Sequence, residues 1–411
     1  MSSETQVELT LTEMAFGGTA IGRLADGRAI FVPYALPGER VLIEIVEQKA
    51  HHAFGKLLRV LEPASQRIPA RCPHFGECGG CHYQHLPYEE QVSLKARLLA
   101  EQLQRIGGLD DLPPIQIHPS PAPWHYRNSL QFHLTPEGKL GFQRAQSHET
   151  LAIEQCFLPL EPLVDLWKHI EVDPTSGVER VVLRCDSAEN LLLVLESQSP
   201  ITPEVMVEEM PLSVVHLSPA GSLVIAGSEH LWMEVKGQQL RLSAGAFFQV
   251  NTAVAEQIVD DLLSHLTLSP NDTLLDVYCG GGLYSLFLAP KVKRLIGIEN
   301  SPYACRDFEV NLDAFDHVEL YEAGAEQVLP SLNLQPQTVL LDPPRNGLSK
   351  IVRQALWQLA PRQIAYVSCD PATFARDARH FAQNGYRLEH LAFFDMFPQT
   401  YHIEALGIWR R

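Results

Sequence analysis

The sequence has no apolar run long enough to cross a membrane. Its most apolar stretches, such as residues 190–196, have the length of a strand. The first ten residues, MSSETQVELT, contain no basic segment followed by an apolar one, so we expect no signal peptide and a cytoplasmic location. We find no internal repeat and no low-complexity tail.

Positive charge is also scarce. The chain has 32 Lys and Arg residues against 49 Asp and Glu residues, which gives a net charge of −17. Nucleic-acid-binding proteins usually carry a basic footprint, and here there is no long run of Lys or Arg. The overall charge therefore argues mildly against a nucleic-acid partner, although it does not exclude a local basic cleft.

The chain of 411 residues is too long for one typical core, and its pattern changes along its length. Residues 1–62 show short alternating strands and glycine turns, which predict a small OB-like β-barrel. Residues 63–240 hold a loop-rich stretch, an amphipathic helix at 89–107 and a mostly antiparallel sheet. Residues 241–411 alternate strands with helices, which predicts an α/β doubly wound, Rossmann-like domain. We therefore expect a multidomain protein.

Cysteine spacing points to a metal. In a reducing compartment, eight cysteines favour metal binding or catalysis over disulfides. Cys72, Cys78 and Cys81 have the spacing C-x5-C-x2-C in a loop-rich region, with Cys156 far downstream. Four such thiolates could hold zinc or an iron–sulfur cluster, and the spacing does not distinguish the two. It differs from the C-x3-C-x2-C pattern of radical enzymes, so we expect a structural metal.

Another cysteine, Cys369, ends the strand predicted at residues 363–367. Asp370 suits the N-cap and Pro371 the first position of a following helix. This places a thiol at the carboxyl end of a strand, where open α/β sheets bind their ligands. The adjacent helix N-terminus is expected to lower the pKa of the thiol. The alternative is a small buried core cysteine.

A glycine turn, Gly280-Gly281-Gly282, follows the strand predicted at residues 273–277. Glu299 comes about twenty residues later, at the end of the next strand, where a carboxylate can accept both hydroxyls of a ribose. Because Ser285 breaks the pattern G-x-G-x-x-G, a dinucleotide site is not indicated. Turn and acid together favour a site for a nucleotide or for S-adenosylmethionine (SAM).

Two further motifs follow later strands. Asp342-Pro343-Pro344-Arg345 forms a loop that two prolines make rigid, and such a loop can position cofactor and substrate. Glu404 lies beside apolar residues near the last strand, where partial burial would raise its pKa and suit it to general-base work. The alternatives are an ordinary strand-ending turn and a solvated glutamate.

Taken together, these motifs resemble the RNA uracil-C5 methyltransferase family, close to its 23S ribosomal RNA branch. The elements DxYCGGG, GIE, DPPR and SCDPATxARD occur in the family's order, and residues 245–251 resemble the segment that opens its methyltransferase domain. The resemblance implies three domains: a TRAM domain at 1–62, a central mostly antiparallel α+β domain with an iron–sulfur lobe at 63–240, and a SAM-dependent methyltransferase domain at 241–411.

The resemblance also implies roles for individual residues. Cys369 would be the nucleophile and Glu404 the base. The residues that would contact SAM are Gln249, Tyr278, Glu299, Asp342 and the backbone near Gly324. The ligands of a [4Fe-4S] cluster would be Cys72, Cys78, Cys81 and Cys156. The candidates for contact with RNA are Phe247 or Phe248, stacking on the target base, and Arg127.

This reading predicts a monomer that modifies RNA, most of all 23S ribosomal RNA, with transfer RNA as the alternative. A cytosine-C5 enzyme would take a second cysteine from another loop, and the DPPR loop has none, which favours uracil. An exocyclic-amine methyltransferase would not need Cys369. A non-catalytic iron–sulfur RNA-binding protein and a metal-dependent redox sensor are further alternatives.

Overall fold

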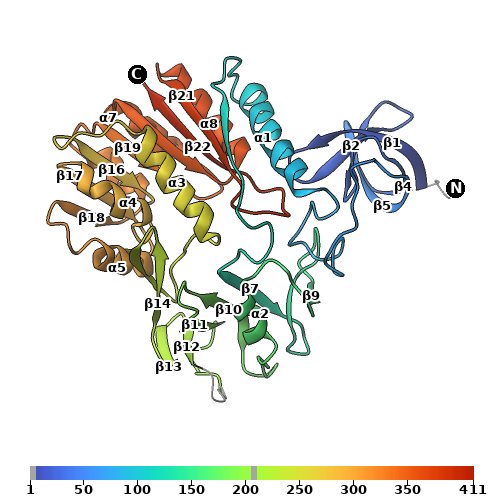
Figure 1. Cartoon of the computed structure of the whole chain (residues 1–411), viewed down its shortest axis with the longest axis horizontal. Helices are drawn as coiled ribbons and strands as arrows, with labels where there is room; N and C mark the ends of the chain where they lie inside the picture. Colours follow the sequence, from blue (N-terminus) through green and yellow to red (C-terminus); the bar gives the residue numbers. More distant parts are fainter. Residues whose placement is uncertain (1–5, 205–210) are drawn as a thin grey trace. The chain divides into compact units, whose positions relative to one another are not determined.

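The computed structural model describes residues 6–204 and 211–411, which divide into two compact units (Figure 1). The first unit contains residues 6–98, Phe142–Gln155 and Phe397–His402. The second contains Leu99–Gly141, Cys156–Met396 and Ile403–Arg411.

The first unit is built on a closed barrel with the strand order β1-β2-β3-β5-β4. The strands are β1 (Gln6–Ala15), β2 (Thr19–Arg23), β3 (Ala29–Pro33), β4 (Arg40–Gln48) and β5 (His52–Glu62). Alternate side chains such as Leu9 and Leu11 are buried, as expected of a sheet with one face on the core. The buried Glu39 accepts hydrogen bonds from the backbone of Leu36 (2.9 Å) and the guanidinium of Arg67 (2.9 Å), which fastens the chain that leaves the barrel. The predicted small barrel is confirmed.

Helix α1 (Tyr88–Arg105) confirms the amphipathic helix predicted at residues 89–107. It buries apolar side chains such as Leu98 and Leu103. Its buried Gln91 donates to the Gln399 side chain (3.0 Å) and accepts from the Gln399 backbone (3.0 Å). These bonds hold the short segment Phe397–His402 within the first unit, which also contains β9 (Thr150–Ala152).

The second unit contains an eight-stranded sheet with the order β18-β17-β16-β19-β20-β22-β21-β6. The strands are β6 (Ile115–His118), β16 (Thr273–Val277), β17 (Arg294–Glu299), β18 (Val318–Glu322), β19 (Thr338–Leu341), β20 (Gln363–Ser368), β21 (Arg387–Phe394) and β22 (Glu404–Arg410). From β18 to β20 all neighbours are parallel, whereas β22 is antiparallel to β20 and β21. The buried strands β19 and β20 are typical of a sheet covered on both faces, which confirms the doubly wound prediction.

Helices cover both faces of this sheet. They are α3 (Thr252–His265), α4 (Leu283–Leu288), α5 (Pro302–Asn311), α6 (Ala325–Val328), α7 (Lys350–Leu359) and α8 (Pro371–Gln383), with 3-10 turns at Ala289–Lys291 and Leu329–Ser331. Tyr366 of β20 packs against Phe374 of α8, and the register puts Leu391 of β21 on that same face. The adjacent His390 therefore faces the other side, where it contacts Asp261 of α3.

A second sheet precedes the large one in the chain. Its order in the second unit is β13-β12-β11-β10-β7-β8, and the hairpin β14–β15 follows it. The elements are β7 (Ser129–Leu134), β8 (Leu140–Gln143), α2 (Glu161–Trp167), β10 (Val178–Cys185), β11 (Leu191–Ser197), β12 (Leu212–Ser218), β13 (Gly221–Ala226), β14 (His230–Val235) and β15 (Gln238–Ser243). Only the β11–β12 pair is parallel, so the central sheet is mostly antiparallel as predicted.

Strand β6 differs from the prediction, because it pairs with β21 at the edge of the large sheet instead of joining the central one. The open edge of β21 supplies backbone partners that a four-residue strand needs. The domain boundaries after residues 62 and 240 stay predictions. Within the described ranges, no helix combines the length and apolarity needed to span a membrane.

Candidate active site

Cys369 and Glu404 meet at one edge of the large sheet. Strands β20 and β22 are antiparallel with Ser368 opposite Ala405. Cys369 directly follows β20, Glu404 begins β22, and the two side chains are close enough for the Glu404 charge to act on the Cys369 thiol. Because β22 runs against its neighbours, its first residue lies at the edge where the parallel strands end. Asp342 follows β19 at the same edge. Three residues predicted from separate motifs are thus brought together.

The carboxyl groups at this edge resist ionisation. Burial raises the pKa of Glu404 well above its ordinary value, and the neighbouring Asp342 adds to the effect. Burial also raises the pKa of Asp342 to about 7, with further contributions from Asp276 and Glu299. Each negative charge disfavours the next, because little water is present to screen them. A cluster of buried acids is the main electrostatic feature of the site.

The predicted lowering of the Cys369 pKa is wrong. Burial, together with Glu404 and Asp342, raises the pKa of the thiol to about 12, and Arg345 opposes this only in part. The helix start is as predicted, because the Asp370 side chain accepts a hydrogen bond from Thr373 N (2.8 Å). A helix N-terminus contributes only about 0.3–1 kcal/mol, which burial and two carboxylates outweigh.

The glycine turn between β16 and α4 lies against Glu299. The Glu299 carboxylate accepts hydrogen bonds from the backbone of Gly280 (3.0 Å), Asn300 (2.8 Å) and Ser301 (2.8 Å), which fixes it beside the turn. Gly280 has φ +54°, and apart from Gly280 and its two chain neighbours no heavy atom of the described residues lies within 4 Å of the place where a Cβ would stand. The turn therefore leaves open space next to a fixed carboxylate.

Two polar side chains beside the turn were not identified from the sequence. Asp276 is fully buried and accepts from the Ser285 hydroxyl (2.6 Å), but its other oxygen meets no hydrogen-bond partner in the described part of the chain. The buried Tyr284 hydroxyl, beside the Gln249 side chain, likewise has no partner of good geometry there. The sequence feature that could have identified them is Tyr284-Ser285 inside an otherwise apolar helix, because hydroxyl groups there have no packing advantage.

The DPPR loop is held against α8. The buried Asp377 carboxylate accepts from the Leu348 backbone (2.9 Å), the Tyr366 hydroxyl (3.0 Å) and Arg353 (2.9 Å). Arg376 donates to the carbonyl of Asn346 (3.0 Å) in the same loop. Buried charges of this kind are stable only when fully paired, so the network rigidly orients the loop that carries Asp342.

Other predicted cofactor residues surround this region. Gln249 is buried, and its backbone carbonyl accepts a hydrogen bond from the Asn128 side chain (2.9 Å). Tyr278 has φ +66°, an unusual value for a bulky residue and one that often marks a functional constraint. Gly324 caps the short helix α6. Their contacts with a cofactor stay predictions.

The two candidate stacking residues differ in exposure. Phe247 is 72% exposed, whereas Phe248 packs against the buried Met233 and Leu242. Phe247 is therefore the aromatic side chain available to a base. The backbone N–H of Arg127 donates a hydrogen bond to the Leu158 carbonyl. The contact of Arg127 with RNA stays a prediction.

The cysteines separate into two kinds. Cys72, Cys78 and Cys81 lie in the first unit and are half-buried, and Cys78 feels the charge of Cys72. Burial raises the pKa of Tyr34 to about 12, and the charges of Cys78 and Cys81 add to this effect. Cys156 is also half-buried and belongs to the second unit. The buried cysteines with a packing role are Cys185, Cys279 and Cys305. All eight lie in the described ranges, and none forms a disulfide.

Comparison with known proteins assigns the chain to a family. Residues 226–411 match the model of the tRNA (uracil-5-)-methyltransferases, and residues 5–58 match the TRAM domain. An uncharacterized RNA methyltransferase of Streptomyces avermitilis is 32% identical over 99% of this chain and 98% of its own length. The chain belongs to the RNA uracil-5 methyltransferase family. A second relative, an uncharacterized RNA methyltransferase of Aquifex aeolicus, is 33% identical and covers 98% of both chains.

The fold of this RNA methyltransferase also matches a solved structure. The tRNA (uracil-54, C5)-methyltransferase of Pyrococcus abyssi, in complex with S-adenosyl-L-homocysteine, superposes with a TM-score of 0.74. The match covers 98% of this chain and 100% of the other, at 22% identity. It supports the architecture of barrel and methyltransferase fold.

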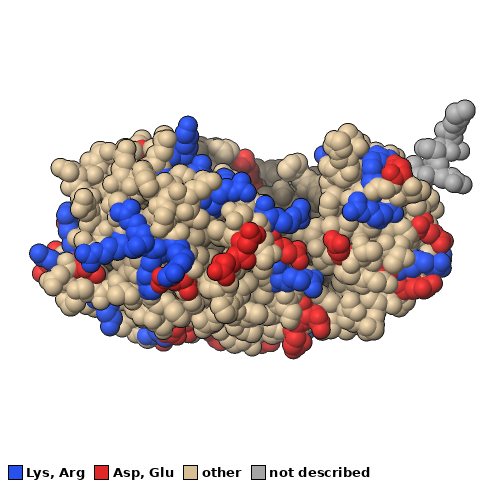
Figure 2. Space-filling model, turned by 90° about the horizontal axis from the view of Figure 1, so that it is seen from above, with Lys and Arg blue, Asp and Glu red and all other residues tan. Residues whose placement is uncertain are grey.

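Charge on the surface of this RNA methyltransferase is mixed. Figure 2 shows Lys and Arg side chains in small groups, several of them beside Asp or Glu. Many basic residues are paired on the surface, as Arg294 is with Glu319 (2.7 Å) and Lys236 with Asp260 (2.7 Å). Overall charge therefore does not by itself mark the path of an RNA.

Proposed function

We propose that this chain is a SAM-dependent methyltransferase that forms 5-methyluridine in RNA, with 23S ribosomal RNA as its main target. The observation that carries the proposal is the placement of Cys369 beside Glu404 at the carboxyl edge of the sheet. A thiol that adds to a pyrimidine and a base that removes a ring proton are the two protein groups this reaction needs.

The residues present fit SAM. The open space at Gly280 lies beside the fixed Glu299 carboxylate, which suits a ribose. One Asp276 carboxylate oxygen is buried without a hydrogen-bond partner in the described chain, as a polar ligand would require. The buried acids favour a ligand with positive charge, and bound SAM supplies an electrophilic methyl group on a sulfonium. We propose Gln249, Tyr278, Glu299, Asp342 and the backbone near Gly324 as its contacts.

Cys369 begins the reaction. Its thiol must first lose a proton, and the neighbouring Asp342 carboxylate accepts that proton, which leaves Glu404 ionised for the later step. The sulfur then forms a bond to carbon 6 of uracil, and the electrons of the 5,6 double bond move through carbon 5 to the carbonyl oxygen. The resulting enolate would make carbon 5 nucleophilic, and the methyl group that bound SAM supplies would pass to carbon 5 as its bond to the sulfonium sulfur breaks and that sulfur leaves as a neutral thioether.

Glu404 completes the reaction. Its ionised carboxylate removes the proton from carbon 5, the electrons of that C–H bond restore the double bond, and the bond from carbon 6 to sulfur breaks. Cys369 leaves as the thiolate. The raised pKa of Glu404 makes its carboxylate a stronger base than an exposed glutamate.

A uridine inside folded RNA must leave its stack to reach Cys369. Unstacking costs a few kcal/mol. Phe247, which is 72% exposed, offers a ring on which the displaced base can stack, worth about 1–3 kcal/mol. The TRAM domain supplies an RNA-binding surface in this proposal.

We propose that Cys72, Cys78, Cys81 and Cys156 hold a [4Fe-4S] cluster. The first three fit a metal group, because they are half-buried and electrostatically coupled in a loop-rich segment, and Gly80 N donates to the sulfur of Cys78 (3.4 Å). Zinc is the alternative for the same thiols. The cluster would hold the loops in place and take no part in methyl transfer.

Mapping 5-methyluridine in ribosomal and transfer RNA tests the proposal. Cells without the gene should lose the modification from 23S ribosomal RNA, and wild-type protein should restore it. Cys369→Ala should bind RNA but restore nothing. Transfer RNA is the second candidate because the matching family model is named for it. Loss of the modification from transfer RNA alone would contradict the ribosomal target, and methylation by Cys369→Ala would contradict the chemistry.

A further inference from the structure

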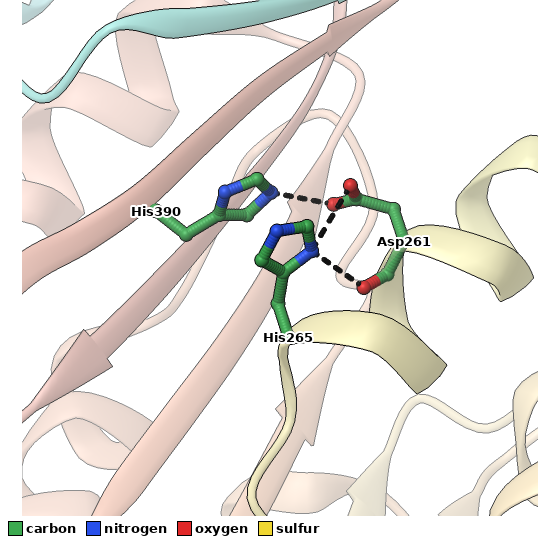
Figure 3. Close-up of side chains that lie close together, drawn as sticks. All are labelled: Asp261, His265 and His390. Carbon is green, nitrogen blue, oxygen red and sulfur yellow. Dashed lines mark hydrogen bonds and ion pairs between the residues drawn. The ribbon is translucent and has the colours of Figure 1, made fainter.

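A cluster of histidines surrounds the aspartate Asp261 (Figure 3). Asp261 and His265 lie on the last turns of α3, and His390 lies on β21. Ligand atoms of these three residues all lie within 4.8 Å of one another. A fourth residue, His118 of β6, approaches from the edge strand, with Nε2 3.7 Å from the Asp261 carboxylate. The cluster thus joins a helix and two strands.

The carboxylate at its centre, that of Asp261, is buried. His390 Nε2 lies 2.6 Å from one carboxylate oxygen, and His265 Nδ1 lies 3.2 Å from the other. A nitrogen lone pair would repel a carboxylate at these distances. Each of the two nitrogens must therefore carry a proton or bind a metal ion.

Two atoms in the cluster lack a partner. His118 Nε2 and one Asp261 carboxylate oxygen are both buried and form no hydrogen bond in the described chain, although they face each other at 3.7 Å. This distance is too long for a hydrogen bond. Two ligands on a tetrahedral zinc ion lie about 3.3 Å apart, given bonds of 2.0–2.1 Å. The 3.7 Å between His118 Nε2 and the Asp261 oxygen is therefore compatible with two ligands of one ion after a small shift, whereas the 3.2 Å to His265 lies at the upper limit of a hydrogen bond.

We propose that Asp261, His265, His390 and His118 form a structural site for Zn²⁺, separate from the thiolate site. Neutral imidazole and carboxylate are the nitrogen and oxygen ligands that zinc prefers. The ion would connect α3 to β21 and to the edge strand β6.

Binding of zinc requires one rearrangement. The rings of His265 and His390 are stacked, with centroids 3.7 Å apart and an interplanar angle of 13°. Both rings cannot point at one ion while they are parallel, so one must turn. The side chain of His265 is 36% exposed and can turn, whereas His118 is stacked on Phe394 and is fixed. His265 also exchanges its bond to the Asp261 carbonyl (3.0 Å) for the ion.

The test compares zinc binding by the full chain and by two cluster variants, His390→Gln and His265→Gln. Wild-type protein, dialysed against a chelator, should bind one more equivalent of Zn²⁺ than either variant. Zinc should raise the unfolding temperature of the wild type more than that of the variants. X-ray absorption at the zinc edge should show ligands at about 2.0–2.1 Å for nitrogen and oxygen, distinct from sulfur at about 2.3 Å at the cysteine site.

The matched control is His169→Gln. His169 bonds the carbonyl of Asp165 at the end of α2 (2.9 Å), the same helix-end arrangement as His265 and Asp261, but without a second histidine. This variant should keep the full zinc content. If His390→Gln does not fold, the half-exposed His265 variant decides. Equal zinc content in the wild type and the folded cluster variants would overturn the proposal and assign the cluster to protons alone.

Discussion

Cys369 is subject to opposing effects on one atom. The helix that starts at Asp370 favours its thiolate, whereas burial and the carboxylates of Asp342 and Glu404 favour its thiol. The second effect is larger, because a buried charge loses its hydration while the helix contributes only partial charges. Cys369 is therefore protonated in the free protein. We expect a positively charged ligand in the site to favour loss of the thiol proton.

Glu404→Gln should stall the reaction after methyl transfer. The amide cannot remove the proton from carbon 5, so the bond from Cys369 to the base cannot break. We expect a covalent RNA–protein adduct on denaturing gels, and a fall in product release of about 10²–10⁴-fold. Cys369→Ala is the control and should give no adduct. Free methylated RNA at the normal rate would show that another group is the base.

Asp342→Asn should lower the pKa of Cys369. The Asp342 charge raises the pKa of the thiol, so its removal increases the thiolate fraction at a given pH. Because the pKa of Asp342 is itself about 7, the effect should be largest above that pH. Mass spectrometry of the Cys369 peptide after iodoacetamide treatment, as a function of pH, measures the shift.

Asp370→Asn is the matched control for that experiment. It makes the same chemical change next to Cys369, and asparagine remains a good N-cap. Asp370 is not among the groups that shift the thiol pKa. An equal shift in both variants, or an upward shift in Asp342→Asn, would contradict the assignment.

At the scale of elements, the site depends on where strands end. Strand β16 ends in the glycine turn, β19 in the DPPR loop and β20 in Cys369, while the antiparallel β22 begins with Glu404 at the same edge. Helix α8 then orients the DPPR loop through Arg376 and Asp377. The turn and the loop are thus rigid before any ligand is present, which lowers the entropic cost of binding.

Two neighbouring glycines should respond differently to alanine. Gly282 has φ +87°, and a Cβ there would stand 2.5 Å from Leu312, so Gly282→Ala should lower the free energy of unfolding by about 1–3 kcal/mol or more. Gly280 has open space, so Gly280→Ala should cost about 1–2 kcal/mol but place a methyl group in the proposed SAM site.

Urea unfolding and calorimetric titration with SAM separate the two effects. Gly280→Ala should remain folded and bind SAM at least tenfold more weakly. Unchanged SAM affinity in this variant would place the cofactor elsewhere.

At the scale of the whole molecule, the chain combines a barrel unit and a methyltransferase unit. The metal group proposed for Cys72, Cys78, Cys81 and Cys156 has a structural role in this scheme. Electron transfer has no place in the proposed chemistry.

Methyl transfer should accordingly be independent of the redox state of the cluster. Protein reduced anaerobically with dithionite and protein kept oxidised should methylate RNA at the same rate, within about twofold, because no step at Cys369 uses an electron. Absorbance and electron paramagnetic resonance report the state of the cluster during the assay. Activity that follows the redox state would instead support a redox sensor.

Local order along the chain was readable from sequence. The N-terminal barrel, helix α1 (Tyr88–Arg105), the doubly wound C-terminal region and the N-cap at Asp370 depend on periodicity and on residues that are neighbours in sequence. The order of motifs likewise sufficed for the family, because each motif is a strand end with its own turn chemistry.

The tertiary structure alone decided what these elements bring together. It brought Cys369 next to Glu404, moved β6 to the large sheet, left Phe247 exposed while Phe248 packs against Met233 and Leu242, and gathered the histidines around Asp261. It also reversed the expected sign of the Cys369 pKa shift. The physical reason is that burial and Coulomb interactions depend on every group that surrounds an atom, and those groups come from distant parts of the sequence.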